Sequence, residues 1–495
     1  MPKYSSLITL SIALILYLTG CAHIPLPTRS VHTGESGPPG RSADFFASLD
    51  YRIKESEVID PGVFRVKGYP YLRVNRFLAS FRAEAAADEA AFSAWVDRMQ
   101  DLDQKARVYE TANLVVADGT AFKSLDGGAG LKSRIAACGD LLKAIDFKGK
   151  NKRKDLPGNI SAPDDYIQLR RILGVSPITG WFVLHGVLNW QEEVRERFSL
   201  KPPAGWKTRL YLPDLTIDPS TFQQRPVQAD PDALGIPSYS PADMEILFRM
   251  HAPVWEIQVQ GDHDRIGRPV WTKQETLDVD TGAPTTYTRL SFTRFGKDIL
   301  TQLNYIIWFP ARPRTGPLDI YGGLLDGVNL RITLDKDGQP LLYETMHNCG
   351  CYYKAYPTPG LEVRREIDYE EPPLILKAPD IDPARQRLAL AMESGTHFVQ
   401  HIFPVSRKAR PPATGYSLAD YGRLRSLPLA NGRRKSMFAE NSIAPGSERL
   451  ERFLLWPTGV LSPGAMRQWG RHAVAFKGRR HFDDPFYMDR MFTRK

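Results

Sequence analysis

Between about residues 209 and 375 the chain alternates apolar and polar residues, and this pattern constrains its fold more than any other feature. The segments "VWEIQVQ", "TTYTRLSFTRF" and "TQLNYIIWFP" carry β-branched and aromatic residues with a period of two, as in half-buried strands. Asp337-Gly338 is a dipeptide typical of a hairpin turn. The sequence therefore predicts a central antiparallel β-rich region over residues 209–375.

The preceding region, residues 43–208, has a helical pattern instead. The stretch 77–114 is rich in Ala, Glu, Arg and Leu, and further helices are expected near 131–145 and 190–198. Large apolar residues recur through the stretch at helical spacing and predict a buried stripe rather than a cofactor contact: Phe77, Phe81, Phe92, Trp95, Met99 and Leu102.

Residues 376–495 are predicted to form a mixed, basic C-terminal region. The segment 382–404 is rich in Ala and Leu, which favours a helix that ends at Pro404, and the rest has no regular pattern. Together, the helical region, the β-rich region and this irregular end predict an α+β fold.

The first 20 residues have the features of an export signal. A short basic stretch ends at Lys3, and an uncharged apolar run follows from Leu7 to Leu18. A bilayer span needs about 20 apolar residues, so this run is too short to cross a membrane. It ends in Leu18-Thr19-Gly20-Cys21, which resembles the lipobox of bacterial lipoproteins.

The resemblance implies that residues 1–20 are removed and that Cys21 is acylated on its sulfur and on its new amino group. Three acyl chains would anchor the protein stably, with the membrane as its partner. In that family an aspartate after the cysteine favours the inner membrane, whereas this chain has Ala22. The resemblance therefore implies an outer-membrane lipoprotein whose body faces the periplasm. Residues 21–42, rich in Pro, Gly, Ser and Thr, are expected to form a lipidated flexible tether.

The segment "ETMHNCGCYY" places His347, Cys349 and Cys351 at alternate positions. On one strand they would share a face at intervals of about 6–7 Å. Imidazole and thiolate ligands suit zinc or copper, but one segment cannot close a metal site. If 382–404 is helical, His397 and His401 lie one turn apart on one face and are the best further ligands. This pattern predicts a ligand or metal site near residues 347–351.

Two other interpretations of the same segment stay open. In an oxidising periplasm Cys349 and Cys351 would form a strained local disulfide, or one of them would pair with Cys138. Alternatively, the three side chains only pack in the core.

Candidate acid and base residues are less specific. Asp262 and Asp264 flank a histidine in "GDHDRIGRP", between two predicted strands, although this composition is more typical of a hairpin loop. Glu344 precedes His347 by three residues and would face the other side of a regular strand. If the protein is an enzyme, which the sequence leaves open, a metal would activate water or polarise a substrate with Asp264 or Glu344 as base.

Positive charge is concentrated near the C-terminus. Residues 401–495 contain 18 Lys and Arg against 7 Asp and Glu, in a chain of net charge +9. Such an excess indicates an anionic partner or a solvated basic face. An export signal excludes cytoplasmic nucleic acid, which leaves lipopolysaccharide phosphates, anionic phospholipid or an acidic wall polymer. Two functions follow: an envelope lipoprotein that binds a ligand or metal near 347–351, or a non-catalytic envelope protein that binds an anionic polymer or a protein through its basic end.

Overall fold

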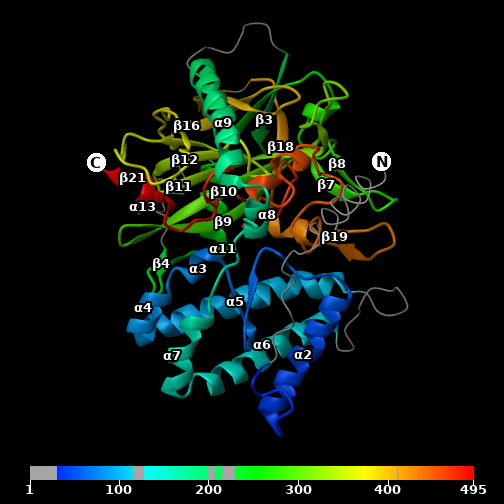
Figure 1. Ribbon diagram of the computed structural model, residues 1–495, viewed down its shortest axis with the longest axis vertical. Coiled ribbons are helices and arrows are strands. Elements are labelled where there is room, and N and C mark those ends of the chain that lie inside the picture. Colours follow the sequence, from blue (N-terminus) through cyan, green and yellow to red (C-terminus); the bar gives the residue numbers. More distant parts are fainter. Residues whose placement is uncertain (1–29, 115–126, 199–206, 215–228, 410) are drawn as a thin grey trace, which may run out of the picture.

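A computed structural model describes residues 30–114, 127–198, 207–214, 229–409 and 411–495. Its centre is a large curled mixed sheet, with the N-terminal helices in a layer below it in the view of Figure 1. The α+β class predicted from the sequence is confirmed. Among the described residues, no helix combines the length and the hydropathy that crossing a bilayer requires.

The N-terminal layer is built around one long helix, α5, which carries the predicted apolar stripe. The helix begins after Asp88, whose side chain accepts a hydrogen bond from the backbone of Ala91. Phe92, Trp95 and Met99 are buried in a core of this layer, so the stripe is confirmed. The elements of the layer are α2 (Pro38–Glu55), β1 (Phe64–Val66), β2 (Tyr69–Val74), α3 (Arg76–Ala79), α4 (Arg82–Ala87), α5 (Glu89–Asn113), α6 (Gly127–Asp146) and α7 (Lys150–Asn159).

Part of the expected tether is folded. His32 is buried, and its Nε2 lies 2.9 Å from Oδ1 of Asp146 at the end of α6. Helix α2 already begins at Pro38. The second half of the tether, residues 30–42, therefore packs on the helical layer, whereas Cys21 lies outside the described residues.

The sheet has the strand order β15-β13-β12-β11-β10-β9-β18-β3-β6-β16-β17. Successive strands from β9 to β13 pair antiparallel, and the predicted Asp337-Gly338 turn joins β11 to β12 with Gly338 at φ 77°. The bounds are β3 (Thr208–Pro213), β6 (Val254–Gln258), β9 (Thr285–Phe295), β10 (Asp298–Arg312), β11 (Gly323–Leu334), β12 (Pro340–His347), β13 (Lys354–Pro357), β15 (Leu374–Ile375), β16 (Gln386–Met392), β17 (Val399–Ser406) and β18 (Thr414–Asp420).

The sheet extends beyond residue 375, and the helix predicted over 382–404 is wrong. That segment forms β16 and β17, which pair antiparallel. Leu388, Leu390 and Met392 alternate along β16 and are buried in the main core, so the segment is stabilised by this burial rather than by the helix propensity of Ala and Leu. Pro404 is tolerated because β17 is the last strand of the sheet.

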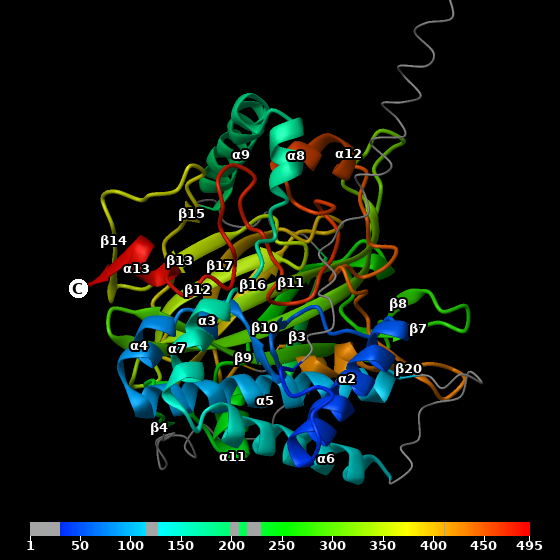
Figure 2. The same cartoon turned by 60° about the horizontal axis from the view of Figure 1, so that its bottom comes forward.

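The remaining elements surround the sheet. Figure 2 shows α8, α9 and α12 grouped at the end of the molecule opposite the N-terminal layer. They are α8 (Gln168–Leu173), α9 (Ser176–Phe198), α11 (Pro241–Met250), α12 (Arg452–Leu455), α13 (Tyr487–Met491), the 3-10 turns η1 (Asp262–Asp264), η2 (Tyr421–Arg425) and η3 (Trp456–Thr458), and the short pairs β4 (Asp230–Pro231) with β5 (Pro237–Ser238), β7 (Arg268–Trp271) with β8 (Leu277–Asp280), β14 (Leu361–Val363) with β21 (Phe492–Arg494), and β19 (Leu427–Pro428) with β20 (Arg434–Lys435).

Candidate functional site

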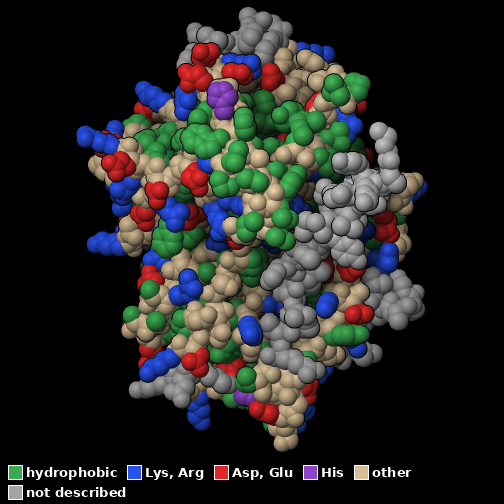
Figure 3. All heavy atoms as spheres, in the orientation of Figure 1, with side chains coloured by type: hydrophobic (Ala, Val, Ile, Leu, Met, Phe, Trp, Pro, Cys, Tyr) green, Lys and Arg blue, Asp and Glu red, His purple; other side chains and the backbone are tan. Residues whose placement is uncertain are grey.

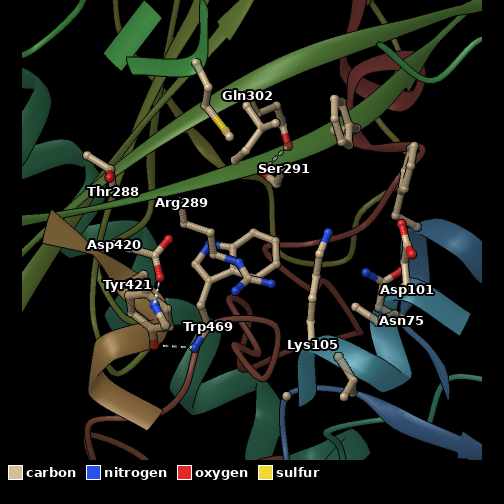
Figure 4. A pocket seen from close by; sticks show the side chains of 18 of the residues that line it. Asn75, Asp101, Lys105, Thr288, Arg289, Ser291, Gln302, Asp420, Tyr421 and Trp469 are labelled. Carbon is tan, nitrogen blue, oxygen red and sulfur yellow. Dashed lines mark hydrogen bonds between the residues drawn. The ribbon is translucent and has the colours of Figure 1, made fainter. Parts of the chain in front are cut away.

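A cavity of about 910 Å³ lies between the N-terminal helical layer and the sheet. Helix α5 forms one wall, β9 and β10 form another, and the segments around residues 420 and 469 complete it. Its polar side chains come from all of these elements and are labelled in Figure 4: Asn75, Asp101, Lys105, Thr288, Arg289, Ser291, Gln302, Asp420, Tyr421 and Trp469.

The wall on the sheet is set by strand register. Arg289 pairs with Asn304, and Ser291 pairs with Gln302, across β9 and β10. Because side chains alternate between the faces of a strand, these four lie together on one face. Leu303 lies between Gln302 and Asn304 along β10, and Tyr305 follows Asn304; both are buried in the main core on the opposite face. The alternation therefore builds a polar row on the side that the helical layer covers.

Hydrogen bonds fix this polar row and the Trp469 ring. Trp469 Nε1 donates to Asn304 Oδ1 at 3.1 Å, and Asn304 Nδ2 donates to Ser291 Oγ at 2.9 Å. Ser291 Oγ donates in turn to Gln302 Oε1 at 3.1 Å. The backbone N–H of Trp469 donates to the Tyr421 hydroxyl at 2.8 Å. The indole is thus held in one orientation against the cavity.

Arg289 places its guanidinium over that indole. Its Cζ lies 4.3 Å from the centre of the Trp469 ring and 5.8 Å from that of Tyr421 (Figure 4). Its Nε is buried without a hydrogen-bond partner, and the described part of the chain offers Arg289 no ion pair. Burial lowers the pKa of Arg289, yet a guanidinium keeps its proton at neutral pH. Among the described residues this cation has no ion pair, although the carboxylates of Asp420 and Asp483 are near enough to oppose the lowering of its pKa.

A second cation extends into the cavity beside the Trp469 ring. Lys105 of α5 has its ammonium group there, and it too has no ion pair within the described ranges (Figure 4). The other cations of the wall are neutralised, because Arg98 pairs with Asp232 at 2.8 Å and Arg425 pairs with Asp60.

Two of the carboxylates near the cavity already have partners within the protein. Asp420 accepts a hydrogen bond from the backbone of Gly422 at 2.8 Å, and Asp483 pairs with Arg76 at 2.9 Å. Asp101 lies beside Asn75, on the side of the cavity away from Arg289 (Figure 4). The positive potential at Arg289 and Lys105 is therefore only weakly opposed.

The rest of the wall is apolar. It comes from both layers and includes Phe77, Leu78, Leu102, Met244, Leu290, Phe292 and Leu418. Sites for small molecules are commonly about 300–1,000 Å³ in volume and combine apolar walls with a few fixed polar groups. This cavity has both properties.

Three residues predicted as site candidates come together elsewhere, around Asp326, which sequence reasoning missed. Asp326 Oδ2 lies 2.9 Å from His397 Nδ1, and its Oδ1 lies 3.4 Å from His347 Nδ1. His397 Nε2 lies 3.4 Å from Asp264 Oδ1. Burial alone would raise the pKa of Asp326, but His347 and His397 lower it well below its usual range. A lone carboxylate in the apolar strand "LLDGVNLRI" was the signal for a buried charge pair.

This group of four is buried and does not line the 910 Å³ cavity. His397 is fully buried, and its ring stacks on Phe309 with centroids 3.8 Å apart. Its φ of 54° places it in the turn between β16 and β17 rather than on a helix. Asp264 also accepts hydrogen bonds from Ser394 Oγ and Gly395 N, so it ties this turn to η1. The group therefore joins four segments of the fold: η1, β11, β12 and the turn between β16 and β17.

The other predicted residues lie apart from this group. His401, on β17, contacts Phe198 and Phe403, so it does not share a helical face with His397. Asp262 is exposed and pairs with Arg265 at 3.1 Å. It lies in η1, and the flanking strands do not pair with each other, so the expected hairpin loop is wrong. Glu344 faces away from His347, as expected, and pairs with Arg331 at 2.5 Å.

Cys349 and Cys351 are free thiols in this structure, as is Cys138. Cys349 is buried in a core cluster, and its Sγ accepts a hydrogen bond from the backbone N–H of Cys351 at 3.4 Å. The disulfide inferred from their spacing stays a prediction. Within the described ranges, no group of three or more His, Cys, Asp or Glu side chains is arranged to hold a metal ion.

Comparison with protein-family models, with curated proteins and with solved structures finds no match to this chain.

Proposed function

We propose that this protein is an exported, lipid-anchored envelope protein whose folded body binds an organic anion in the cavity between the helical layer and the sheet. The single observation that carries the binding proposal is the guanidinium of Arg289, which is half-buried in a 910 Å³ cavity with no carboxylate partner in the described chain. A buried charge is costly unless it is paired, and a bound anion would pair it.

The wall indicates the chemistry of the ligand. A carboxylate or phosphate would meet the planar fork of Arg289 and the ammonium of Lys105. Thr288 and Ser291 also line the cavity, but their hydroxyl groups already donate to Ala419 O at 3.3 Å and to Gln302 Oε1 at 3.1 Å, so the two cations are the main donors for an anion. The apolar side chains around Phe77 and Phe292 would take the remainder of the ligand, so an anion with an apolar body fits better than a bare ion.

The envelope location is supported by the sequence around Cys21 alone. Mass spectrometry of the mature N-terminus tests it. A diacylated, N-acylated Cys21 at the N-terminus is expected, and a chain that retains Met1 contradicts it.

The alternative, polymer binding by the basic C-terminal region, is less well supported. Several of its arginines are buried and donate hydrogen bonds to backbone carbonyl oxygens. Arg449 donates to Leu324 O at 2.7 Å, and Arg467 donates to Leu461 O at 2.9 Å. Part of the positive charge of residues 401–495 therefore stabilises the fold.

A thermal-shift and calorimetry screen tests the binding proposal. The probes are octanoate and octyl phosphate, with octyl glucoside as an uncharged molecule of similar apolar length. The wild-type chain should bind an anionic probe, and Arg289→Ala should weaken that binding about 10- to 100-fold. Arg98→Ala is the matched control, because Arg98 also lines the cavity but is already paired. Equal affinity of the wild type and Arg289→Ala for the anions would overturn the proposal.

A further inference from the structure

Large apolar side chains are exposed together on α8 and α9. Ile172 and Ile178 are 63% and 62% exposed, and Trp181 and Phe182 are 66% and 78% exposed. Figure 3 shows hydrophobic side chains gathered over these two helices on the face toward the viewer. Single exposed apolar residues are ordinary, but a contiguous group marks an interaction surface.

Two other segments extend this surface. Phe453 and Leu454 of α12 are each 63% exposed, and Leu318 in the loop after β10 is 92% exposed. The segments are neighbours, because the backbone N–H of Ile167 donates to Gly459 O at 2.8 Å and that of Glu451 donates to Ile320 O at 3.1 Å. We call these exposed side chains of α8, α9, α12 and residues 318–324 the apolar end.

The charges at the apolar end are mostly positive. Residues 168–189 and 452–482 contain no Asp or Glu at all. Their cations include Arg452, which is exposed and whose Cζ lies 4.9 Å from the ring of Phe453. Lys477 is 14% exposed, and its Nζ lies 5.2 Å from the ring of Trp181. The acidic side chains lie at the border of the apolar end: Asp319 accepts hydrogen bonds from its own loop, and Glu370 lies 3.7 Å from Lys477. In the last turns of α9, Glu192 and Glu193 lie 3.3 and 3.9 Å from Arg195 and Arg197. Aromatic and aliphatic tips beside cations complement an anionic lipid surface.

From this geometry we infer that the apolar end inserts into the headgroup region of an anionic bilayer. The helices lie on the membrane rather than across it, since no described helix is apolar enough to span one. Trp181 and Phe182 enter the interface, and Arg452 contacts lipid phosphates. This contact is a second attachment of the folded body, independent of acylation at Cys21, and it shares no residue with the cavity.

Vesicle sedimentation of the full chain tests the inference. All proteins carry Cys21→Ala, so that no acyl chain contributes and any effect of the N-terminal apolar run is common to them. The probe is a vesicle of phosphatidylethanolamine and phosphatidylglycerol, compared with one of phosphatidylcholine. The variant replaces Trp181, Phe182, Phe453 and Leu454 with Ser. The matched control replaces Tyr51 and Val108 with Ser, which are 61% and 45% exposed outside the apolar end.

The expected result is a reduction in partitioning to anionic vesicles of about tenfold or more for the apolar-end variant and little change for the control, with weaker binding of the parent to phosphatidylcholine. Circular dichroism and the thermal midpoint establish that the variant folds. Equal partitioning of a folded variant and its parent would overturn the inference. So would a parent dimer that the variant converts to a monomer while vesicle binding stays unchanged, because the surface would then be covered by a second copy.

Depth-dependent quenching by brominated lipids gives a second, independent readout. Trp181→Phe should bind vesicles as its parent does but lose most of the quenching. If quenching is unchanged in Trp181→Phe, the indole of Trp181 does not enter the lipid and the inference fails. Neither result bears on Arg289, so loss of the membrane contact and loss of anion binding are distinguishable.

Discussion

Arginines buried in the N-terminal layer and the arginine in the cavity have opposite surroundings. Arg73 is fully buried and donates to Asp103 at 2.9 Å and to both oxygens of Glu110 at 2.8 and 2.6 Å. Arg107 pairs with Asp103 and with Asp50, each at 2.8 Å. Arg289 has stacking partners but no carboxylate among the described residues.

This difference distinguishes arginines whose ion pairs stabilise the fold from an arginine that has no ion pair. In the helical layer the guanidinium groups of Arg73 and Arg107 have carboxylate or carbonyl partners for their donors, so these two arginines are satisfied without any ligand. The pKa of Arg73 is raised, because nearby Glu110 and Asp103 outweigh the effect of burial, whereas burial lowers that of Arg289. A charged side chain that lines a cavity without an ion pair is therefore a better indicator of function than a fully paired one.

The largest expected effect comes from breaking the complete network. Arg73→Ala leaves Glu110 and Asp103 buried without their cation, and we expect the free energy of unfolding to fall by about 3–5 kcal/mol. Urea unfolding followed by circular dichroism measures it. A loss below about 1 kcal/mol would show that water or rearrangement can satisfy the carboxylates and would weaken the comparison.

Removing the unpaired cation, Arg289, should change stability little and anion binding strongly. We expect Arg289→Ala to cost less than about 1 kcal/mol of stability in the absence of ligand, because no ion pair is lost, while anion binding loses about 1.5–3 kcal/mol. Urea unfolding and calorimetry on one preparation measure both. A stability loss as large as that of Arg73→Ala would mean that Arg289 has a structural partner.

Buried histidines extend the comparison to pH. Burial, and then a nearby arginine, lower the pKa values of His251 and His472 to about 3. These histidines therefore contribute stability above about pH 6.5 that is lost as the pH falls toward 3. Burial would also lower the pKa of His397, but Asp264 and Asp326 raise it, so its contribution is present below about pH 6.5 and is lost as the pH rises through its pKa in the folded protein.

Stability is thus expected to be highest near pH 6.5 and to fall below it by about 1.4 kcal/mol per pH unit for each of His251 and His472. Urea unfolding at pH 4.5, 5.5, 6.5 and 7.5 measures the profile. His472→Gln should reduce the slope of the unfolding free energy against pH below pH 6.5 by the contribution of one histidine. An unchanged slope in that variant would mean that His472 is protonated in the fold.

The smallest effect is expected at an exposed pair. Arg268 lies 3.0 Å from Asp280, with 55% and 40% of the side chains exposed. Arg268→Ala should change stability by no more than about 1 kcal/mol, and salt should remove the difference. Unfolding at low and high ionic strength checks this. A larger, salt-independent loss would show that burial does not determine what an ion pair contributes here.

The sequence predicted those features that depend on residues close together in the chain. The apolar stripe around Trp95 and the turn at Gly338 are set by residues close together in the chain, and both are confirmed. The segment of β16 and β17 was predicted wrongly because its Ala and Leu favour a helix in isolation, whereas its burial depends on β6, more than 120 residues earlier.

The candidate site was harder to predict for the same reason. His347 and His397 were predicted as metal ligands and Asp264 as an acid or base, whereas the structure places both histidines beside Asp326 and places Asp264 beside His397. Arg289 is one polar position in an alternating strand. Nothing near it in the sequence reveals that α5, almost 180 residues earlier, covers that face and encloses a cavity.

The proline in the final strand of the sheet has a consequence for how molecules of this protein meet one another. An exposed strand edge is a template on which another chain can add a strand and begin to aggregate. Pro404 supplies no backbone N–H for such an addition, and at the other edge β15 is only two residues long, Leu374–Ile375. Both ends of the sheet therefore resist growth into a shared sheet, which would keep the bodies of neighbouring molecules separate even at high local concentration.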